Sequence, residues 1–482
     1  MARRARYICA RRPLLQLPSL DPSWGGDLWP ANKPHWHSAP TRLIGRRTFI
    51  RRRIVSEGRK PKNPATHIGN HKLDPATLMM GYGYDPSLSE GSLKAPIFHT
   101  STFVFEKAAD GKHFFEGITG KRPGGTDGLV YARFNNPNQE MLEDRLALWE
   151  DAEEALVFSS GMTAISILLL SFARPGDVIL MSGPLYAATE TIIMKILSQF
   201  GIGHVDFPAG ATREEIDAAM EKAKTLADEQ GGSVAMIYLE SPGNPTNALV
   251  DVQAVDAARK AMLPDTPIAI DNTFLGPLWS RPQDHGADIS VYSLTKYAGG
   301  HSDLVAGGLT GKKALLDKVR PMRNTLGGIC DANTAWMLMR SLETLELRMS
   351  RAGENAEKVC KFLRSHDKVD RVAYLGFLEE GTRQRDIYDR HDLGAGSTFS
   401  LYLKGGEAEA FRFLDALQIA KLAVSLGGTE TLASAPAAMT HLSVPDERRK
   451  QLDITDSLVR ISIGIERPED LIADFSNALD AV

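Results

Sequence analysis

Short, mostly apolar runs of residues alternate with stretches of helical length and spacing through the middle of the chain. An apolar run without polar alternation belongs to a strand that is buried on both faces, so this pattern is typical of a parallel sheet covered by helices. Helix-like stretches lie at 187–199, 213–229 and 251–262. We therefore predict an α/β fold with a mainly parallel sheet and helices on both of its faces. The predicted strands are Ala155–Phe158, Val178–Met181, Val234–Leu239, Ile268–Ile270, Ile289–Tyr292 and Leu304–Leu309.

The sequence on either side of these strands has a different character. Residues 63–135 are rich in Gly, Pro and Asn and show little periodicity, which predicts an extended N-terminal arm. A large domain then spans 136–345. One long helix is predicted over 334–364, and it leads into a smaller α+β domain at 346–482.

The N-terminus is strongly basic. Residues 1–62 hold 15 Lys and Arg against 3 Asp and Glu, although the whole chain has a net charge of -4. An Arg-rich, acid-poor stretch suits an organelle transit peptide or a basic arm for nucleic acid or a membrane. Because this stretch has few Ser and no clean amphipathic helix, we favour a third interpretation. In it, residues 1–62 are a disordered extension, or sequence upstream of the true start codon.

Composition excludes several other classes of protein. The chain is 43% hydrophobic and 24% charged, as ordinary globular proteins are. It has no run of 18 apolar residues, so we expect no membrane partner. Its 3 cysteines include no CxxC pair, which predicts neither a disulfide framework nor a metal site and indicates a reducing, cytoplasmic compartment. The near-neutral charge gives no reason to expect nucleic acid.

Two charged residues follow buried strands of the predicted sheet. Asp271 comes directly after Ile268–Ile270, and Lys296 comes shortly after Ile289–Tyr292. Ligands of an open parallel sheet bind at the carboxyl ends of its strands, and a charge there is costly unless it is compensated. One interpretation is a salt bridge between the two side chains. The other is a lysine amine tuned to form a Schiff base.

Other residues at the same edge of the sheet offer complementary groups. Gly161 opens a helix after Ser159-Ser160, where exposed N–H groups and the helix dipole suit a phosphate, although an ordinary N-cap has the same pattern. Tyr186 could stack on a flat ring or simply pack. Asn244, between Gly and Pro, is a turn residue first and a candidate ligand second.

One ligand satisfies these groups together. Pyridoxal 5'-phosphate needs an amine for its aldehyde, a carboxylate for its ring nitrogen, hydroxyls and amides for its phosphate, and a flat face to stack on. A carboxylate keeps the pyridine nitrogen protonated and so makes the ring an electron sink. The residues that supply these parts are Lys296, Asp271, Ser293, Thr295, Gly161 and Tyr186.

The chain also resembles the Cys/Met-metabolism family of fold-type I pyridoxal-phosphate enzymes, over about residues 67–482. That family includes cystathionine γ-synthase, cystathionine γ-lyase, methionine γ-lyase and O-acylhomoserine sulfhydrylase. The resemblance implies the fold-type I transferase fold, with a mainly parallel seven-stranded sheet and a smaller C-terminal domain. It is carried by Tyr131-Ala-Arg133-Phe-Asn-Asn-Pro137, Ser160-Gly161-Met162, Glu240-Ser-Pro-Gly-Asn244-Pro, Asp271-Asn-Thr273, Ser293-Leu-Thr-Lys296-Tyr, Ser425-Leu-Gly427, Met439-Thr-His441 and Val459-Arg460-Ile-Ser-Ile-Gly464.

The resemblance assigns roles to individual residues. It makes Lys296 the lysine that bonds the cofactor and shuttles protons between Cα, Cβ and Cγ of the substrate. Asp271 pairs with the pyridinium, and Tyr186 stacks on the ring and helps to move protons. Asn244 contacts the ring hydroxyl. The phosphate is held by Gly161, Met162, Ser293 and Thr295.

By the same resemblance, the substrate and a second subunit complete the site. Arg460 clamps the substrate carboxylate, for which its bidentate fork is suited, and Ser425 assists there. Tyr131 and Arg133 are similar to the pair that reaches the phosphate of a neighbouring subunit, which gives the arm 63–135 its role. The implied assembly is a homodimer or homotetramer acting on a small amino acid.

The shared machinery serves both elimination and replacement at Cγ. Val424 stands before Ser425, where relatives that handle cystathionine tend to carry Glu, so this position resembles methionine γ-lyases. Ala188 stands where methionine γ-lyases typically carry Cys, which points the other way. We expect γ-elimination on a sulfur-containing amino acid, of the methionine γ-lyase type. The alternative is γ-replacement of the cystathionine γ-synthase or O-acylhomoserine sulfhydrylase type.

Overall fold

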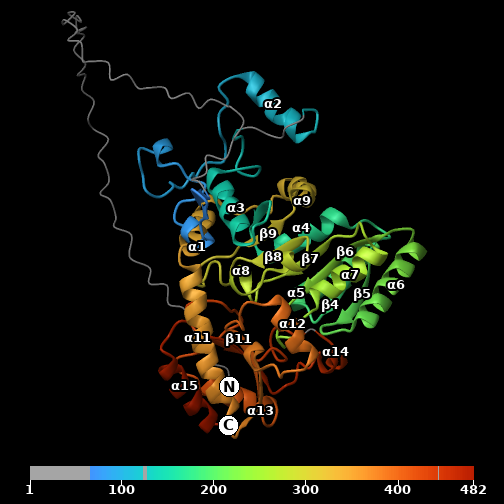
Figure 1. Ribbon diagram of the computed structural model, residues 1–482, viewed down its shortest axis with the longest axis vertical. Coiled ribbons are helices and arrows are strands. Elements are labelled where there is room, and N and C mark those ends of the chain that lie inside the picture. The colour runs from blue at the N-terminus through green and yellow to red at the C-terminus, as the bar shows by residue number, and fades with distance from the viewer. Residues whose placement is uncertain (1–65, 123–127, 443) are drawn as a thin grey trace, which may run out of the picture. The chain divides into compact units, whose positions relative to one another are not determined.

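A seven-stranded sheet forms the centre of the computed structural model, which describes residues 66–122, 128–442 and 444–482 (Figure 1). The predicted extension, 1–62, lies outside the described residues. The strand order is β3-β9-β8-β7-β6-β4-β5. Strands β8, β7, β6, β4 and β5 are parallel, whereas β9 and β3 are antiparallel to their neighbours, which confirms a mainly parallel sheet. The strands are β3 Glu154–Phe158, β4 Val178–Gly183, β5 Gly203–Pro208, β6 Val234–Glu240, β7 Ile268–Asp271, β8 Ile289–Ser293 and β9 Gly307–Gly311.

The strands predicted from apolar runs do not include β5. It lies at the edge of the sheet beside β4. Val205 and Phe207 are buried, whereas His204 and Asp206 are only half-buried. The strand therefore alternates apolar and polar residues, and a search for continuous apolar runs passes over it.

Helices cover both faces of this sheet, as predicted. Along β4, Ile179 and Met181 pack in one core with α4, whereas Val178 and Leu180 pack in another with α6 and α7. Successive strand residues point to opposite faces, so these two cores lie on opposite sides of the sheet. The helices concerned are α3 Pro137–Trp149, α4 Gly161–Phe172, α5 Ala187–Thr191, α6 Arg213–Gln230, α7 Val252–Met262, α8 Gly276–Trp279 and α9 Lys313–Leu326; a π turn, Ile192–Ile196, and a 3₁₀ turn, Leu197–Phe200, continue α5.

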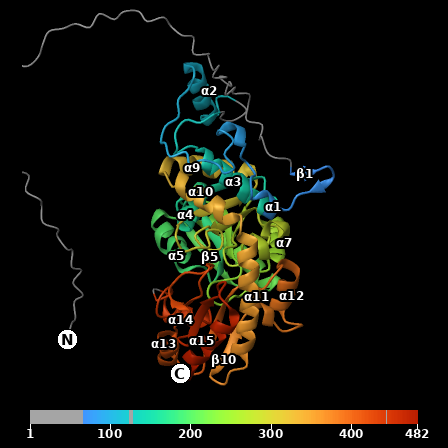
Figure 2. The same cartoon turned by 90° about the vertical axis from the view of Figure 1, so that its left-hand side faces the viewer.

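The single helix predicted over 334–364 is two helices. Helix α10, Ala332–Leu342, ends before Thr344, whose backbone leaves the helical region at φ -118° and ψ 12°, and α11 spans Leu345–Arg364. The guanidinium of Arg348 reaches back and donates to the carbonyl of Ser341 at 2.9 Å, so it satisfies a carbonyl freed at the break. Figure 2 shows α11 leading from α10 toward β10.

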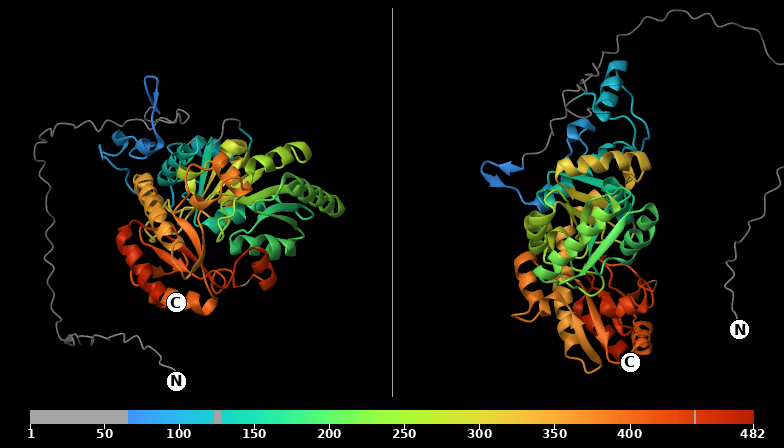
Figure 3. Two further views of the ribbon diagram at one scale, coloured as in Figure 1. Left: turned by 60° about the horizontal axis from the view of Figure 1, so that its bottom comes forward. Right: turned by 90° about the vertical axis from the view of Figure 1, so that its right-hand side faces the viewer.

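A second sheet forms the C-terminal part of the chain, with the order β10-β11-β14-β13-β12. All of its pairs are antiparallel except β12 with β13. Helices α11, α13 and α15 pack on it in one apolar core, and Figure 3 shows this orange and red sheet separate from the green and yellow one. Its elements are β10 Val369–Ala373, β11 Thr398–Leu403, β12 Lys421–Leu422, β13 Leu432–Ser434, β14 Leu458–Ser462, α12 Arg383–His391, α13 Glu407–Ala416, α14 Asp446–Gln451 and α15 Pro468–Asp480.

The described part of the N-terminal arm, residues 66–122 and 128–135, has little regular structure. Several of its large apolar side chains are exposed, Val104 at 94% and Leu93 at 82%. In the part of the chain that the structure describes, no helix is both long and apolar enough to cross a membrane. The arm contains β1 His67–Ile68, β2 His71–Lys72, α1 Pro75–Leu78 and α2 Ala108–Ile118.

A buried ion pair joins helices α3 and α9 across β3. Arg323, 1% exposed, donates to the Glu143 carboxylate at 2.5 Å and to the Val157 carbonyl at 3.0 Å. We expect Arg323→Met to lower the free energy of unfolding by about 3–5 kcal/mol, because it removes the buried cation that hydrogen-bonds the Glu143 carboxylate and leaves only Arg320, at 3.9 Å, near that charge. Urea unfolding followed by circular dichroism measures this.

The matched control is Arg320→Met on the same helix. Arg320 is 30% exposed, pairs with Glu154, which is 23% exposed, and lies 3.9 Å from Glu143, so its loss should cost about 1 kcal/mol or less. Equal losses in the two variants would contradict the claim that burial makes the Arg323 pair the stronger anchor.

Candidate active site

The carboxyl ends of β4, β6, β7 and β8 bring the chemically important side chains to one edge of the large sheet. Asp271 ends β7, and Lys296 follows β8 by three residues. Glu240 ends β6 and is the register partner of Asp271 on the neighbouring strand. This is the edge at which open parallel sheets bind ligands.

Lys296 has no carboxylate partner among the residues the structure describes. Its Nζ donates to Oγ of Ser425 at 3.0 Å. Burial and the nearby Arg460 charge lower the pKa of this amine to about 8. The amine therefore has an appreciable neutral fraction near neutral pH, as a nucleophile for an aldehyde must.

Asp271 is equally without a cation within ion-pair distance in the described part of the chain. Its side chain is buried, and its carboxylate accepts the Thr273 N–H at 3.0 Å. Burial raises its pKa to about 6. The predicted alternative of a Lys296–Asp271 salt bridge is therefore not what the structure contains. A buried carboxylate and a half-buried amine, neither paired with an opposite charge among the described residues, fit a ligand that carries an electrophilic carbon and a protonated ring nitrogen.

Helix α4 begins beside Ser293. Ser160 caps the helix by accepting the Thr163 N–H at 3.0 Å, and the N–H groups of Gly161 and Met162 follow in the first turn, where they lack intrahelical acceptors. A Cβ on Gly161 would lie only 3.0 Å from Cβ of Ser293, so this close approach favours glycine. The arrangement leaves N–H donors and a hydroxyl together, as a phosphate site needs.

Thr295 makes other contacts in this structure. Its hydroxyl donates to the Ala306 carbonyl at 3.2 Å and accepts the Ala306 N–H at 3.0 Å. These bonds tie the turn that carries Lys296 to the start of β9. Its predicted contact with the phosphate stays a prediction.

The second sheet supplies a buried arginine. Arg460 on β14 is 3% exposed, and it donates to Oδ1 of Asn244 at 3.2 Å and to the Ser425 carbonyl at 3.0 Å. Burial lowers its pKa to about 10, so it remains charged at neutral pH. No carboxylate pairs with it among the described residues, which leaves it suited to clamp one from a substrate. Asn244 contacts this arginine, and its predicted contact with the ring hydroxyl stays a prediction.

The sequence over residues 76–480 matches the model of the Cys/Met metabolism PLP-dependent enzymes. The chain belongs to this family. It is 36% identical over 394 residues to L-methionine gamma-lyase of Fusobacterium nucleatum subsp. polymorphum, covering 81% of this chain and 94% of the relative. It is 35% identical over 408 residues to cystathionine gamma-lyase of Bacillus subtilis, covering 84% and 99%. The crystal structure of cystathionine gamma synthase from Xanthomonas oryzae pv. oryzae superimposes with a TM-score of 0.75 at 29% identity, covering 85% and 98%.

Family membership confirms the fold-type I fold, the pyridoxal-phosphate cofactor and the enzyme class expected from the sequence. The donor set described above fits that cofactor. Lys296 would bond its aldehyde, Asp271 would pair with its ring nitrogen, and the start of α4 with Ser293 would hold its phosphate.

Three predicted site residues lie away from these central contacts or at the surface. Tyr186 is 40% exposed at the start of α5. Tyr131 is also 40% exposed, and the guanidinium of Arg133 donates to the Asn324 carbonyl at the end of α9. Within one chain, the hydrogen bonds and ion pairs of the described residues do not connect Arg133 with Lys296 or Asp271. Its role at a neighbour's phosphate stays a prediction of the family resemblance.

Two further residues lie in the site, and neither was assigned a role from the sequence. Thr273 accepts the Ser293 N–H with its hydroxyl at 2.9 Å and so joins the ends of β7 and β8. Glu240 is buried at the end of β6, and its carboxylate accepts the backbone N–H groups of Tyr186 and Asn244. Its signal was in the sequence, because it is a carboxylate directly after an apolar run, as Asp271 is.

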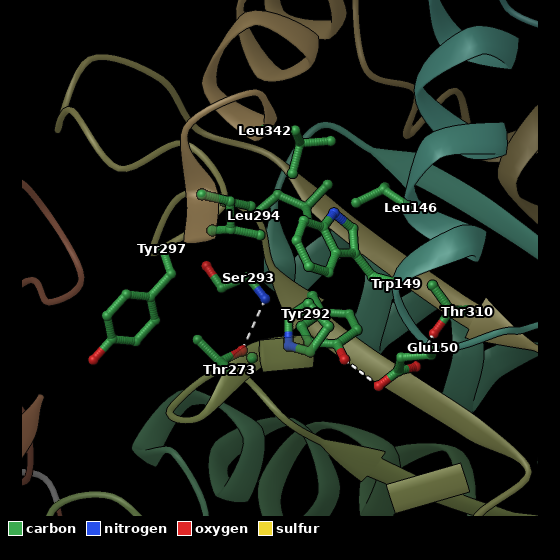
Figure 4. A pocket seen from close by; sticks show the side chains of 14 residues that line it. Leu146, Trp149, Glu150, Thr273, Tyr292, Ser293, Leu294, Tyr297, Thr310 and Leu342 are labelled. Carbon is green, nitrogen blue, oxygen red and sulfur yellow. Dashed lines mark hydrogen bonds between the residues drawn. The ribbon is translucent and has the colours of Figure 1, made fainter. Parts of the chain in front are cut away.

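A small cavity of about 30 Å³ lies behind this edge of the sheet, lined by Thr273 and Ser293 on one side and by helix α3 on the other (Figure 4). Glu150 is fully buried in its wall and accepts hydrogen bonds from Tyr292 and Gln283. Burial raises the pKa of this carboxyl. The cavity is too small for a cofactor, and its hydrogen-bonded wall supports the strands that carry Asp271 and Lys296.

The lowered pKa of Lys296 predicts how cofactor capture depends on pH. The neutral amine attacks the aldehyde, so the rate at which apo-protein takes up pyridoxal 5'-phosphate should rise with pH and level off above about 8. An ordinary lysine would level off only above about 10.4. Stopped-flow measurement of the visible cofactor band gives this profile.

Lys296→Ala is the control for that profile, and it should show neither the saturable visible band nor turnover. A wild-type rate that keeps rising to pH 10 would contradict the tuned amine. Normal turnover by Lys296→Ala would contradict its catalytic role.

Proposed function

We propose that this protein catalyses γ-elimination on a sulfur-containing amino acid, of the methionine γ-lyase type, and converts methionine and water to methanethiol, 2-oxobutanoate and ammonia. One observation carries the proposal: the Lys296 amine, with its lowered pKa, contacts Ser425 at 3.0 Å beside the buried Arg460. A proton acceptor and a carboxylate clamp thus lie close enough to act on one α-amino acid. Relatives named L-methionine gamma-lyase, at 36% identity, support the same reaction.

Each residue then has a definite task. Arg460 binds the substrate carboxylate and orients Cα toward Lys296, which takes the proton from Cα and then acts on the Cβ proton. Tyr186, 40% exposed at the start of α5, would give a proton to the departing sulfur. When bound, the cofactor supplies an electron sink for the charge that develops at Cα. Asp271 holds the ring nitrogen in its protonated form.

The side chain beside the clamp favours an apolar substrate. Val424 precedes Ser425 and is 57% exposed, so it offers no charge to the far end of the substrate. A second ammonium, as in cystathionine, would gain no charged partner from this side chain. A methyl thioether carries no charge and needs no charged partner at Val424.

Replacement at Cγ, of the cystathionine γ-synthase or sulfhydrylase type, is the second candidate. Its support is the similarity to the cystathionine gamma synthase structure, with a TM-score of 0.75, together with Ala188. The two reactions diverge once the leaving group has departed, because water completes the elimination whereas a thiol attacks in the replacement.

An amino-acid panel separates the two reactions. Incubation with methionine should yield 2-oxobutanoate and methanethiol, because Arg460, Lys296 and Val424 suit a short thioether. Incubation with O-succinylhomoserine plus cysteine should yield little cystathionine. Product identification by mass spectrometry decides it, and cystathionine as the dominant product would establish replacement instead.

We further propose a homodimer or homotetramer that works in the cytoplasm. The exposed apolar side chains of the arm, Val104, Phe105 and Phe115 among them, support burial against a second copy. The two cysteines within the described ranges, Cys330 and Cys360, are free and buried, which is compatible with a reducing compartment.

Subunit mixing tests whether sites are shared. Arg133→Ala and Lys296→Ala proteins should each be nearly inactive, and exchange of their subunits should restore partial activity. The reason is that some hybrid sites receive Lys296 from one chain and Arg133 from the other. Recovery is measured as turnover after proven exchange by native mass spectrometry, and its absence would count against the shared site.

A further inference from the structure

The carboxylate of Glu240 holds two backbone segments of the site at once. One oxygen accepts the Tyr186 N–H at 2.6 Å, and the other accepts the Asn244 N–H at 3.0 Å. Tyr186 follows β4 and Asn244 follows β6. A single side chain therefore sets the spacing between the loops that follow two neighbouring strands.

Glu240 is a costly residue to keep in this position. It is 4% exposed, and no lysine or arginine within the described residues forms an ion pair with it. Asp271 stands beside it as its register partner on β7, and burial together with the Asp271 charge raises the pKa of Glu240. A glutamine of the same shape would avoid the like-charge repulsion, so the reason for a carboxylate must lie in what its two oxygens do.

Only a group with two acceptor oxygens satisfies both N–H donors. A glutamine offers one acceptor oxygen, and its NH₂ group would face the N–H of either Tyr186 or Asn244. The bonds are also connected to the substrate clamp, because Oδ1 of Asn244 accepts from Arg460 at 3.2 Å. The position of Glu240 therefore affects the placement of Tyr186 on one side and, through Asn244, of Arg460 on the other.

We propose that Glu240 is a positioning residue of the cofactor site, whose paired hydrogen bonds fix Tyr186 against the cofactor ring and Asn244 against Arg460. The inference rests on the proposed function for the roles of Tyr186 and Arg460. It also requires that pyridoxal 5'-phosphate binds at this edge, and it holds for elimination and replacement alike.

The opposite end of the same strands offers a matched control. Asp177 is also buried, and its carboxylate accepts the Arg174 N–H at 2.7 Å and the Ser233 N–H at 2.8 Å. It bridges the loops that precede β4 and β6, whereas Glu240 bridges the loops that follow them. Asp177→Asn and Glu240→Gln therefore make the same chemical change at the two ends of one pair of strands.

The experiment compares the two variants by cofactor binding rather than by turnover. Apo-proteins prepared by dialysis are titrated with pyridoxal 5'-phosphate, and the dissociation constant and visible circular dichroism of the bound cofactor are recorded. Glu240→Gln should weaken binding about tenfold or more, because one strong hydrogen bond is replaced by a repulsive contact. Its circular dichroism should change, since the ring loses its fixed position. Asp177→Asn should lower the melting temperature while both cofactor readouts stay within about twofold of wild type.

Ser182→Ala provides a second route if Glu240→Gln fails to fold. Oγ of the fully buried Ser182 accepts the Glu240 N–H at 3.1 Å, so its loss loosens Glu240 without removing the carboxylate. It should weaken cofactor binding more than Asp177→Asn does. Equal effects in these two variants, or unchanged binding and circular dichroism in Glu240→Gln, would overturn the positioning role.

The outcome is separable from that of the proposed reaction. A protein that fails the amino-acid panel but shows the Glu240→Gln shift has a correctly described cofactor site and a different substrate. A wild-type protein that binds no pyridoxal 5'-phosphate would overturn both.

Discussion

The cost of burying charge at the carboxyl edge of a parallel sheet determines the rest of this structure. Asp271, Glu240 and Arg460 are all nearly inaccessible to water, and none has an oppositely charged side chain at ion-pair distance among the described residues. Instead, backbone N–H groups, a carbonyl and an amide oxygen surround them. A protonated ring nitrogen beside Asp271 and a substrate carboxylate beside Arg460 would supply two of the missing opposite charges.

The layers around this edge hold these groups in place. Thr273 joins the ends of β7 and β8, and Thr295 ties the turn that carries Lys296 to the start of β9. Behind them, Glu150 accepts hydrogen bonds from Tyr292 and Gln283. Rigid packing on the far side of the sheet therefore limits the freedom of side chains on the near side. The Lys296 amine contacts a hydroxyl from the C-terminal part of the chain, because Ser425 lies between β12 and β13.

Much of this could be read from the sequence, for identifiable reasons. Asp271 and Lys296 follow apolar runs, and a charge after a buried strand is a strong signal. The alternating edge strand β5 and the break at Thr344 gave no such signal, since local pattern does not reveal a sheet edge or the capping by Arg348. The contact between Arg460 and Asn244 joins residues 216 positions apart and depends on the packing of two sheets. Glu240 was within reach of sequence reasoning, but its place in a turn-rich motif obscured its carboxylate.

The division of the site between two sheets has an evolutionary consequence. Asp271 ends β7 of the large sheet and Lys296 follows β8, and we propose that both contact the cofactor; Val424, Ser425 and Arg460 come from the C-terminal part of the chain. Mutations near Val424 can alter which amino acid is accepted while the electron sink and its lysine stay intact. New specificities can then arise without passing through an inactive ancestor, and one scaffold can diversify into several sulfur metabolisms.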